Sequence, residues 1–439
     1  NGPLRRAIAF LEHGAAIHGT RAGGIMADLP DGRPVNAASP SLQPVASGER
    51  IAVLDVLRGA ALLGILLMNI EALSGPLDLA FTGIDVHWQG IDYWADAFVY
   101  VFVQGKFFTL FSLLFGAGFA VMAQRAEAAG RDFTPFYLRR SAGLLLIGLC
   151  HALLVWSGDI LVMYALVSLP LLACREAPRS WLPWMGVTVY LGGVAMMLLV
   201  GAMVSMASAE DVRKMLTDAQ QSIDLQRLVY GQGSWMQANA QRLSEFGTSM
   251  GAMLITGPEV LGMFLIGSWF AGSGALATPD RFPRLYAVLR WGALPFGLLV
   301  TLLGVAWKPY LAPGAYDLPV TAAMALVTIG GLPMCLGYLA WIVHWRARLG
   351  WLAPVGRMAL THYLGQSLLC TWLFYHYGLG AFETMPRSVQ LMFALLLFTV
   401  QVGISHVWLR RFRFGPMEWL WRAMTYRQWP PMRREAGQG

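Results

Sequence analysis

Long apolar runs, each followed by a short basic or polar stretch, repeat along the chain from residue 51 to residue 409. Runs of about 20 apolar residues match the length of a helix that crosses the hydrocarbon core of a bilayer. A chain with an even number of such helices has both ends on one side of the membrane. The pattern predicts ten spanning helices, at residues 51–73, 95–123, 141–157, 159–174, 181–206, 248–276, 285–307, 318–343, 357–376 and 388–409.

These runs predict an all-α, polytopic helical bundle over residues 50–409, in which Gly158-Asp159 forms a tight turn between the third and fourth helices. Within the bundle, residues 208–247 are polar and helix-friendly, which predicts amphipathic helices on the outer surface that act as a solvated lid or as an acceptor-binding element. Residues 1–49 are rich in Gly, Pro, Ala and Ser, which predicts a disordered tail. Residues 410–439 combine Arg with Trp, as in segments at the headgroup level that contact anionic lipids.

The composition excludes a soluble globular protein, because 56% of the 439 residues are hydrophobic and only 13% are charged. The 32 Lys and Arg residues outnumber the 25 Asp and Glu residues, but they are distributed unevenly. Twenty-three lie in the tails and in the loops on the side of the termini, and six lie in the opposite loops. The positive-inside rule therefore predicts cytoplasmic termini, and the basic excess requires no nucleic-acid partner.

The first apolar run carries a polar stripe. Asp55 and Arg58 are three residues apart and share a helix face, and Asn69 returns to that face three turns beyond Arg58. Ionisable residues in a membrane cost roughly 2.5–3.5 kcal/mol each on insertion scales, and they usually face a protein interior or a water-filled cavity. Two interpretations are open: a structural ion pair that locks this helix to its neighbours, or the wall of a site inside the membrane domain.

Other apolar runs also carry polar residues, which we sort by their expected depth. The cytoplasmic half holds Asp55, Arg58, His151, His362 and Gln366; the outer half holds Asn69, Glu71, Asp159 and Glu259; Lys106 lies between them. Each residue alone is explained by a hydrogen bond to a neighbouring helix, but together they favour a shared interior cavity. Pro258 precedes Glu259, which predicts either a helix break that lines a cavity or a plain kink.

The predicted outer loop after the first helix contains His87 among Asp85, Trp88, Gly90 and Asp92. A histidine beside a carboxylate can exchange a proton near neutral pH, although the tryptophans also suit a loop that is simply anchored at the membrane surface. The sequence contains no phosphate-binding loop, no metal-ligand spacing and no serine-hydrolase elbow. Any chemistry must therefore come from dispersed polar groups.

The chain resembles the YeiB-like family of bacterial inner-membrane proteins. The resemblance covers nearly everything from Arg50 to Tyr426, and it implies a multi-pass location in the bacterial inner (plasma) membrane. It rests on Leu54-Asp55 with Arg58-Gly59 and Asn69, on Lys106-Phe107 with Gly116 and Gly118, on His151 with Gly158-Asp159, on Glu259 with Gly262-Met263, on Gly356-Arg357 through Thr361-His362 and Gln366-Ser367, and on Gly415-Pro416-Met417-Glu418-Trp419.

The first helix is also similar to those of two groups of membrane acyltransferases, the heparan glucosaminide acetyltransferase group and a large bacterial O-acyltransferase group. Both begin with a Leu-Asp-x-x-Arg-Gly helix. The heparan group continues with an outer-facing His-x-x-Trp-x-Gly, and its histidine is implicated in acetyl transfer. His87-Trp88-Gln89-Gly90 is similar in position and residue types, with two fewer residues between His and Trp. The resemblance implies a role for His87 in acyl transfer.

Our leading hypothesis is a transmembrane acyltransferase that moves an acyl group from cytoplasmic acyl-CoA to a hydroxyl or amine of an envelope acceptor at the outer face. Its expected residues are His87, Asn69, Asp55 and Arg58 for catalysis, Arg58, Lys106, His151 and His362 for binding acyl-CoA, and Asp159, Glu259 and Gln366 for the rest of a polar cavity, with no metal. The alternatives are a transporter or exporter of a small or lipidic solute, with membrane carboxylates and histidines relaying protons, and a non-catalytic envelope scaffold.

Overall fold

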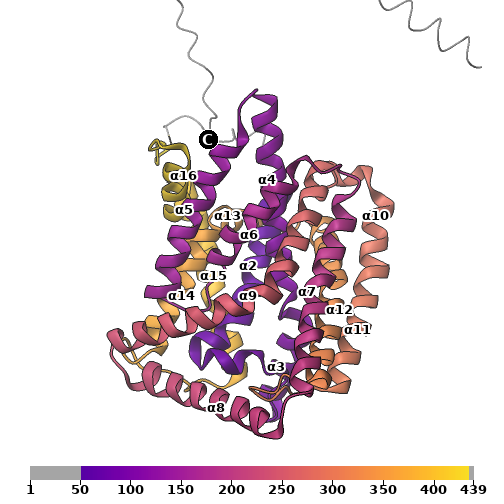
Figure 1. Cartoon of the computed structure of the whole chain (residues 1–439). Helices are drawn as coiled ribbons and strands as arrows, with labels where there is room; N and C mark the ends of the chain where they lie inside the picture. Colours follow the sequence, from indigo (N-terminus) through magenta and orange to yellow (C-terminus); the bar gives the residue numbers. More distant parts are fainter. Residues whose placement is uncertain (1–50, 435–439) are drawn as a thin grey trace, which may run out of the picture. The chain divides into compact units, whose positions relative to one another are not determined.

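The computed structural model describes residues 51–434, and this part of the chain is a bundle of helices (Figure 1). It contains no β-strand; the only extended pairings among these residues are isolated bridges at Gly83–Tyr310 and Phe412–Arg433. Two faces of the bundle matter below. At one end of the bundle lie the start of α2, the end of α15 and the whole of α16, and we name this end the α16 face. Helix α8 lies across the opposite end, which we name the α8 face. The charge distribution predicts that the α16 face is cytoplasmic.

The elements follow one another along the chain with short connections. They are α2 Ala52–Ser74, η2 Leu77–Phe81, α3 Gly90–Phe98, η3 Val99–Val103, α4 Lys106–Ala128, α5 Phe133–Leu154, α6 Leu161–Ala173, η4 Cys174–Glu176, α7 Leu182–Ser205, α8 Ala209–Gln232, α9 Trp235–Gly272, η5 Pro279–Arg281, α10 Pro283–Val288, η6 Leu289–Ala293, α11 Leu294–Trp307, α12 Leu318–His344, η7 Gly350–Leu352, α13 Ala353–Arg357, α14 Ala359–Phe374, α15 Arg387–Arg411 and α16 Pro416–Tyr426.

The structure confirms an all-helical membrane protein. Eight helical segments within residues 51–434 are long and apolar enough to cross a bilayer. The two other predicted spans are also helical, but α6 has 13 residues and α14 has 16. At 1.5 Å per residue these helices are about 20 and 24 Å long, shorter than the ~30 Å hydrocarbon core. The bundle therefore contains two short helices among longer ones.

Three predicted boundaries were wrong, for local reasons. The second span starts at Gly90 and is interrupted at Gly105, whose φ of +77° ends the π-helical stretch Val99–Val103. Residues 155–160 form a loop between α5 and α6 in place of a tight turn at Gly158-Asp159. Helix α9 begins at Trp235 behind a capping box formed by Ser234 and Gln237, and it runs through Pro258 for 38 residues without a break.

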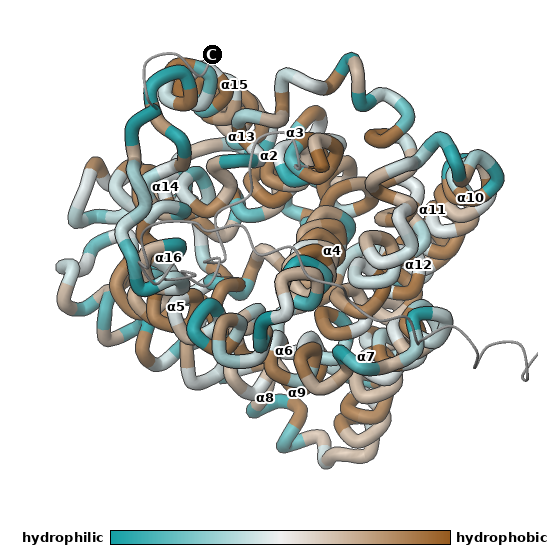
Figure 2. Tube along the Cα trace, turned by 90° about the horizontal axis from the view of Figure 1, so that it is seen from above, coloured by the Kyte–Doolittle hydropathy of each residue, from teal (hydrophilic) through white to brown (hydrophobic). Residues whose placement is uncertain are grey.

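Glycines allow the central helices to approach closely. A side chain on Gly116 would meet the backbone oxygen of Phe264 at 2.0 Å, and one on Gly267 would meet that of Leu113 at 1.8 Å, so α4 and α9 pack almost backbone to backbone. A hydrophobic cluster that includes Leu57 and Leu110 surrounds this contact. Viewed from above, hydrophilic residues concentrate in the connecting loops, while α4 and α7 are largely hydrophobic (Figure 2).

Candidate functional site

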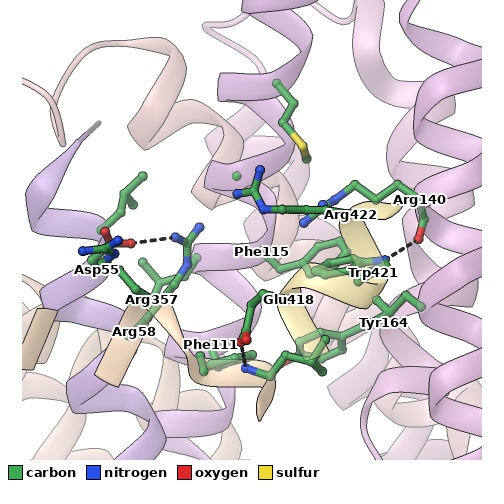
Figure 3. A pocket seen from close by; sticks show the side chains of 18 of the residues that line it. Asp55, Arg58, Phe111, Phe115, Arg140, Tyr164, Arg357, Glu418, Trp421 and Arg422 are labelled. Atoms are coloured by element: carbon green, nitrogen blue, oxygen red, sulfur yellow. Dashed lines mark hydrogen bonds and ion pairs between the residues drawn. The ribbon is translucent and has the colours of Figure 1, made fainter. Parts of the chain in front are cut away.

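A cavity of about 270 Å³ lies between α2, α4, α5, α6, α13, α14 and α16. Its charged lining consists of five arginines and two carboxylates: Arg58, Arg125, Arg140, Arg357, Arg422, Asp55 and Glu418. Its aromatic lining is Phe111, Phe115, Tyr164, Tyr363, Phe414, Trp421 and Tyr426. Figure 3 shows two groups of side chains on opposite sides of the cavity, with Asp55, Arg58 and Arg357 in one and Arg140, Trp421 and Arg422 in the other.

The charged groups that line the cavity are mostly positive. Asp55 Oδ1 accepts a hydrogen bond from Arg58 Nη1 at 3.2 Å, so one carboxylate is already matched to one guanidinium. Five guanidinium groups against two carboxylates leave the lining positive. Arginine forms strong, directional bonds to phosphate and carboxylate groups, because its planar fork presents several N–H donors.

Helix α16 supports two of these arginines with aromatic rings. The Arg140 guanidinium lies 3.5 Å from the ring centroid of Trp421, whose Nε1 donates to the Arg140 backbone oxygen at 2.8 Å. The Arg422 guanidinium lies 4.5 Å from the Phe414 ring. Stacking on aromatic faces holds guanidinium groups in place. Arg140 Nε is buried and has no hydrogen-bond partner in the part of the chain that the structure describes.

Glu418 fastens α16 to the start of α14. Its carboxylate accepts hydrogen bonds from the backbone N–H of Leu360 at 2.7 Å, from that of Thr361 at 3.1 Å, and from the Thr361 hydroxyl. A carboxylate at a helix N-terminus satisfies unpaired N–H groups and matches the helix dipole. Burial raises the pKa of Glu418, and these donors oppose that rise. A side chain on Gly415 would meet the Glu418 carboxylate at 2.2 Å, which explains the glycine.

Helix α13 approaches α2 closely enough to form the other wall. A side chain on Gly356 would lie 1.8 Å from the backbone oxygen of Asp55, and one on Gly59 would lie 2.4 Å from that of Leu352. The next residue is Arg357, which donates from Nη2 to the Arg413 backbone oxygen at 3.3 Å. The glycine pair therefore places the Arg357 side chain next to the Asp55–Arg58 pair.

The cavity is long and changes character along its length. Its lining on α4 extends from Arg125 to Phe111, which is about 21 Å at 1.5 Å per residue. Arginines line the mouth, at the α16 face, whereas aromatic and aliphatic side chains line the inner end. There, the backbone N–H of Ile160 donates to the Tyr363 hydroxyl at 3.3 Å. This gradient suits a ligand with an anionic head and an apolar extension.

Two of the catalytic residues expected from the sequence, Asp55 and Arg58, line this cavity, and the other expected site residues do not. Lys106 is fully buried and donates from Nζ to the Tyr100 backbone oxygen at 2.9 Å, next to the break in the second span. Asn69 is half-buried further along α2. Glu259 lies in the unbroken α9 against Gly193 of α7.

His362 and Gln366 instead join two helices. His362 Nε2 lies 2.6 Å from the Ser405 hydroxyl, and Gln366 Nε2 donates to Gln401 Oε1 at 2.9 Å. Gln401 Nε2 in turn donates to the His362 backbone oxygen at 3.3 Å. These bonds connect α14 to α15 in the way that polar residues stabilise helix pairs in membranes.

His151 and Asp159 form a buried pair. The prediction that they lie in opposite halves of the membrane was wrong, because His151 Nδ1 lies 2.7 Å from Asp159 Oδ1. Their side chains are 1% and 2% exposed. The second carboxylate oxygen of Asp159 accepts the backbone N–H of Val162 at 2.8 Å and caps α6. The loop between α5 and α6 brings the two residues together.

His87 belongs to a second histidine–aspartate pair, on the α8 face. Its Nδ1 lies 2.6 Å from Asp85 Oδ1, and its side chain is 79% exposed. The Asp85 backbone N–H donates to Asp96 at 2.8 Å, which fixes the loop to α3. An exposed histidine that a carboxylate orients can bind or deprotonate an acceptor at that face.

The α8 face also holds two fully buried arginines, which we call the α8-face network. Arg387 Nη2 lies 3.0 Å from Glu71, and its Nε donates to Asp96 at 2.8 Å. Arg242 donates to the Tyr377 hydroxyl at 2.8 Å and to the Leu154 backbone oxygen at 3.2 Å. Three tyrosine rings surround its guanidinium at 5.6 to 6.0 Å, those of Tyr230, Tyr375 and Tyr377.

The comparisons with known proteins cover most of the chain. Residues 270–428 match the family model described as "Protein of unknown function (DUF418)". The chain is 36% identical over 417 residues to the uncharacterized protein YxaH of Bacillus subtilis, covering 90% of this chain and 99% of that protein. It is 34% identical over 395 residues to the uncharacterized protein YeiB of Escherichia coli, covering 86% and 97%. An uncharacterized 39.9 kDa protein of Bacillus acidopullulyticus is 28% identical over 391 residues, covering 88% and 96%.

Proposed function

The chain belongs to the YeiB-like family of membrane proteins, and we propose that it is an inner-membrane acyltransferase that binds acyl-CoA through its α16-face cavity. The acyl group passes to a hydroxyl or amine of an envelope acceptor. The observation that carries this proposal is the cavity itself, in which five arginines and an aromatic wall lead to an apolar inner end. Acyl-CoA has the matching order of parts: phosphates and a purine at one end, and a thioester with an apolar chain at the other.

The lining residues suit the donor. Arg125, Arg140 and Arg422 would bind the phosphates, because guanidinium groups pair with phosphate oxygens. The cavity volume of about 270 Å³ is just below the ~300–1,000 Å³ of pockets that enclose whole drug-sized ligands, so it would enclose the arm and acyl group, with the phosphates and purine at its arginine-lined end. Phe111 and Tyr164, whose rings stack with centroids 6.2 Å apart, would contact the acyl chain.

Acyl transfer also requires a proton acceptor and a donor to the carbonyl oxygen. For an acceptor that reaches the α8 face, His87 with Asp85 is our candidate base, and Asn69 is the candidate donor to the oxyanion. The Asp55–Arg58 pair would position the donor from the other side, since it lines the cavity directly. This assignment keeps the catalytic set expected from the sequence.

The test is thiol release from acetyl-CoA by the purified full chain in liposomes, with an envelope extract as the acceptor. We expect release by the wild type, strong loss in Arg140→Ala, and full release in the control Arg346→Ala, whose guanidinium pairs with Asp280 at 2.8 Å on the same face. His87→Ala tests the outer base in the same assay. Absence of both release and acetyl-CoA binding in the wild type would exclude an acyltransferase of this kind.

One observation favours transport as a second candidate. The cavity lies toward the α16 face, whereas at the α8 face Arg387 and Arg242 are fully buried, an arrangement that suits a carrier open to one side. The cargo would be an anionic amphiphile. Counterflow of such a solute in proteoliposomes, without consumption of acyl-CoA, would support this function against the first.

A further inference from the structure

One face of α5 leads from the cavity into the interior. Arg140 and Leu144 on this face line the cavity, and Gly148, one turn further, packs against the start of α6, where an added side chain would meet the Val162 backbone nitrogen at 2.7 Å. His151 lies eleven residues beyond Arg140, which is three helical turns and about 16 Å. His151 therefore lies on the cavity side of α5, just past the inner end.

The surroundings of His151 fix its tautomer. A carboxylate accepts hydrogen bonds, so in the neutral imidazole the 2.7 Å contact with Asp159 places the proton on Nδ1 and leaves the lone pair on Nε2. The backbone N–H of Val162 holds Asp159 in turn. Nε2 is buried and has no hydrogen-bond partner within residues 51–434. A buried acceptor left unpaired costs about 1–3 kcal/mol, which a purely structural histidine has no reason to carry.

The His151 ring lies next to residues that line the cavity. Ile160, the neighbour of Asp159 in the chain, lines the cavity, and so does Tyr363. The Tyr363 ring centroid lies 5.3 Å from that of His151. The histidine–aspartate pair is therefore one side chain away from the place where an acyl chain bound in the cavity would end.

We propose that His151, oriented by Asp159, is the proton acceptor for acyl transfer at the inner end of the cavity. This inference rests on the proposed acyl transfer but replaces His87 with His151 as its base, so that the reaction takes place inside the bundle. The acceptor oxygen or nitrogen attacks the thioester carbonyl carbon, the new C–O or C–N bond forms, and the C–S bond breaks. The acceptor's proton passes to His151 Nε2 and then to the departing thiolate, so CoA leaves as the thiol and the imidazole returns to its neutral form.

The His87–Asp85 pair lies further from the cavity than the His151–Asp159 pair. His87 is exposed on the α8 face, and on α2 the stretch between Arg58 and Asn69 includes Leu62 and Leu66, both fully buried in the core. A base acts only within hydrogen-bond reach of the proton that it removes, or through one water. A thioester held in the α16-face cavity is closer to meeting this condition at His151.

The experiment measures thiol release from acetyl-CoA and acetyl-CoA binding, side by side, in His151→Gln and Asp159→Asn. Asparagine can still accept from Val162, but its amide donates to His151 Nδ1 and moves the imidazole proton to Nε2, which removes the base without removing the contact. We expect kcat to fall by at least about 100-fold in both variants. The Kd for acetyl-CoA should stay within about twofold of the wild type, which separates lost chemistry from lost structure.

The matched control is His406→Gln. His406 is a half-buried histidine of α15 whose Nδ1 contacts the Val402 backbone oxygen at 2.9 Å, and we expect no change in this variant. If His151→Gln does not fold, Asp159→Asn carries the test alone. Wild-type kcat in Asp159→Asn, or loss of release in His87→Ala with full release in His151→Gln, would overturn the role of His151 and leave the acyltransferase standing. A wild type that neither binds acetyl-CoA nor releases thiol would overturn both.

Discussion

Arginines at the two ends of this bundle have opposite surroundings. On the α8 face, Arg387 is fully buried between two carboxylates, and Arg242 is fully buried among hydroxyl groups, a backbone oxygen and tyrosine rings. In the α16-face cavity, Arg58 keeps 30% of its side chain exposed, and guanidinium groups outnumber carboxylates. The arginines of the α8 face are thus fully buried, whereas those of the cavity lie in a lining with more guanidinium groups than carboxylates.

These different surroundings also determine how much free energy of folding is lost when an arginine is substituted. A buried ion pair roughly balances the desolvation of its charges against their attraction, so removing one member leaves a buried charge without compensation. A guanidinium that lines a cavity remains accessible to a ligand, so its removal acts mainly on binding. Four substitutions test this difference between the arginines of the two faces. Their expected effects decrease from the first to the fourth.

The largest effect is expected for Arg387→Leu. The substitution leaves the buried Asp96 and the partly buried Glu71 without their cation, which costs about 3–5 kcal/mol. Unfolding in detergent, followed by helical circular dichroism, measures the loss. The control is Arg227→Leu, because Arg227 and Glu383 form a half-exposed pair, 42% and 35% exposed, worth about 0–1 kcal/mol. Equal losses in the two variants would contradict the description of the α8-face network.

Arg140→Ala comes next, and here the effect falls on binding. Charge-assisted hydrogen bonds contribute about 1.5–3 kcal/mol, so the Kd for acetyl-CoA should rise about 10- to 100-fold. Raising the salt concentration should weaken wild-type binding more than binding to the variant, which has one charge fewer. Titration calorimetry with the protein in detergent gives both values. An unchanged Kd would remove Arg140 from the site.

Gly356→Ala tests how α13 and α2 shape the cavity. The added methyl would lie 1.8 Å from the Asp55 backbone oxygen, so the helices must separate, at about 1–3 kcal/mol. The control is Gly365→Ala in α14, where nothing lies within 4 Å of the added atom. That variant should be neutral or slightly more stable, because alanine favours helix. Thermal unfolding compares the two, and a neutral Gly356→Ala would contradict the close contact.

The smallest effect is expected for Glu418→Ala, which removes the carboxylate that caps α14. Loss of a helix cap costs about 0.5–2 kcal/mol, and α16 should become looser. Hydrogen exchange at residues 416–426 measures that loosening directly. Asp218→Ala on the exposed surface of α8 is the control and should exchange like the wild type. Protection of residues 416–426 that does not change in Glu418→Ala would show that α16 is held by other contacts.

The candidate site was predictable only in part. The i, i+3 spacing of Asp55 and Arg58 on one apolar helix predicted either a structural ion pair or the wall of a site, and both residues line the cavity. Arg125, Arg140 and Arg422 were interpreted only as topological charges, because arginines at the ends of apolar runs have that role in most membrane proteins, and Arg357 also belonged to the family motif. Glu418 belonged to the family motif Gly415-Pro416-Met417-Glu418. Its partner Thr361 is more than fifty residues away in the sequence, so their contact was not predictable.

The sequence by itself determined the helical membrane architecture, because bilayer thickness and the need to satisfy backbone hydrogen bonds within each helix impose apolar runs of fixed length. Local capping residues mark some helix starts, but the span predicted to begin at residue 248 begins at Trp235, behind the capping box of Ser234 and Gln237. Which polar side chains contact one another depends on the tertiary structure. His151 joins Asp159 across a loop, and Arg387 joins Asp96 across 291 residues. Helical periodicity fixes the face of each residue on its own helix, whereas the rotation and depth of one helix against another come from packing, where glycines such as Gly356 allow contact.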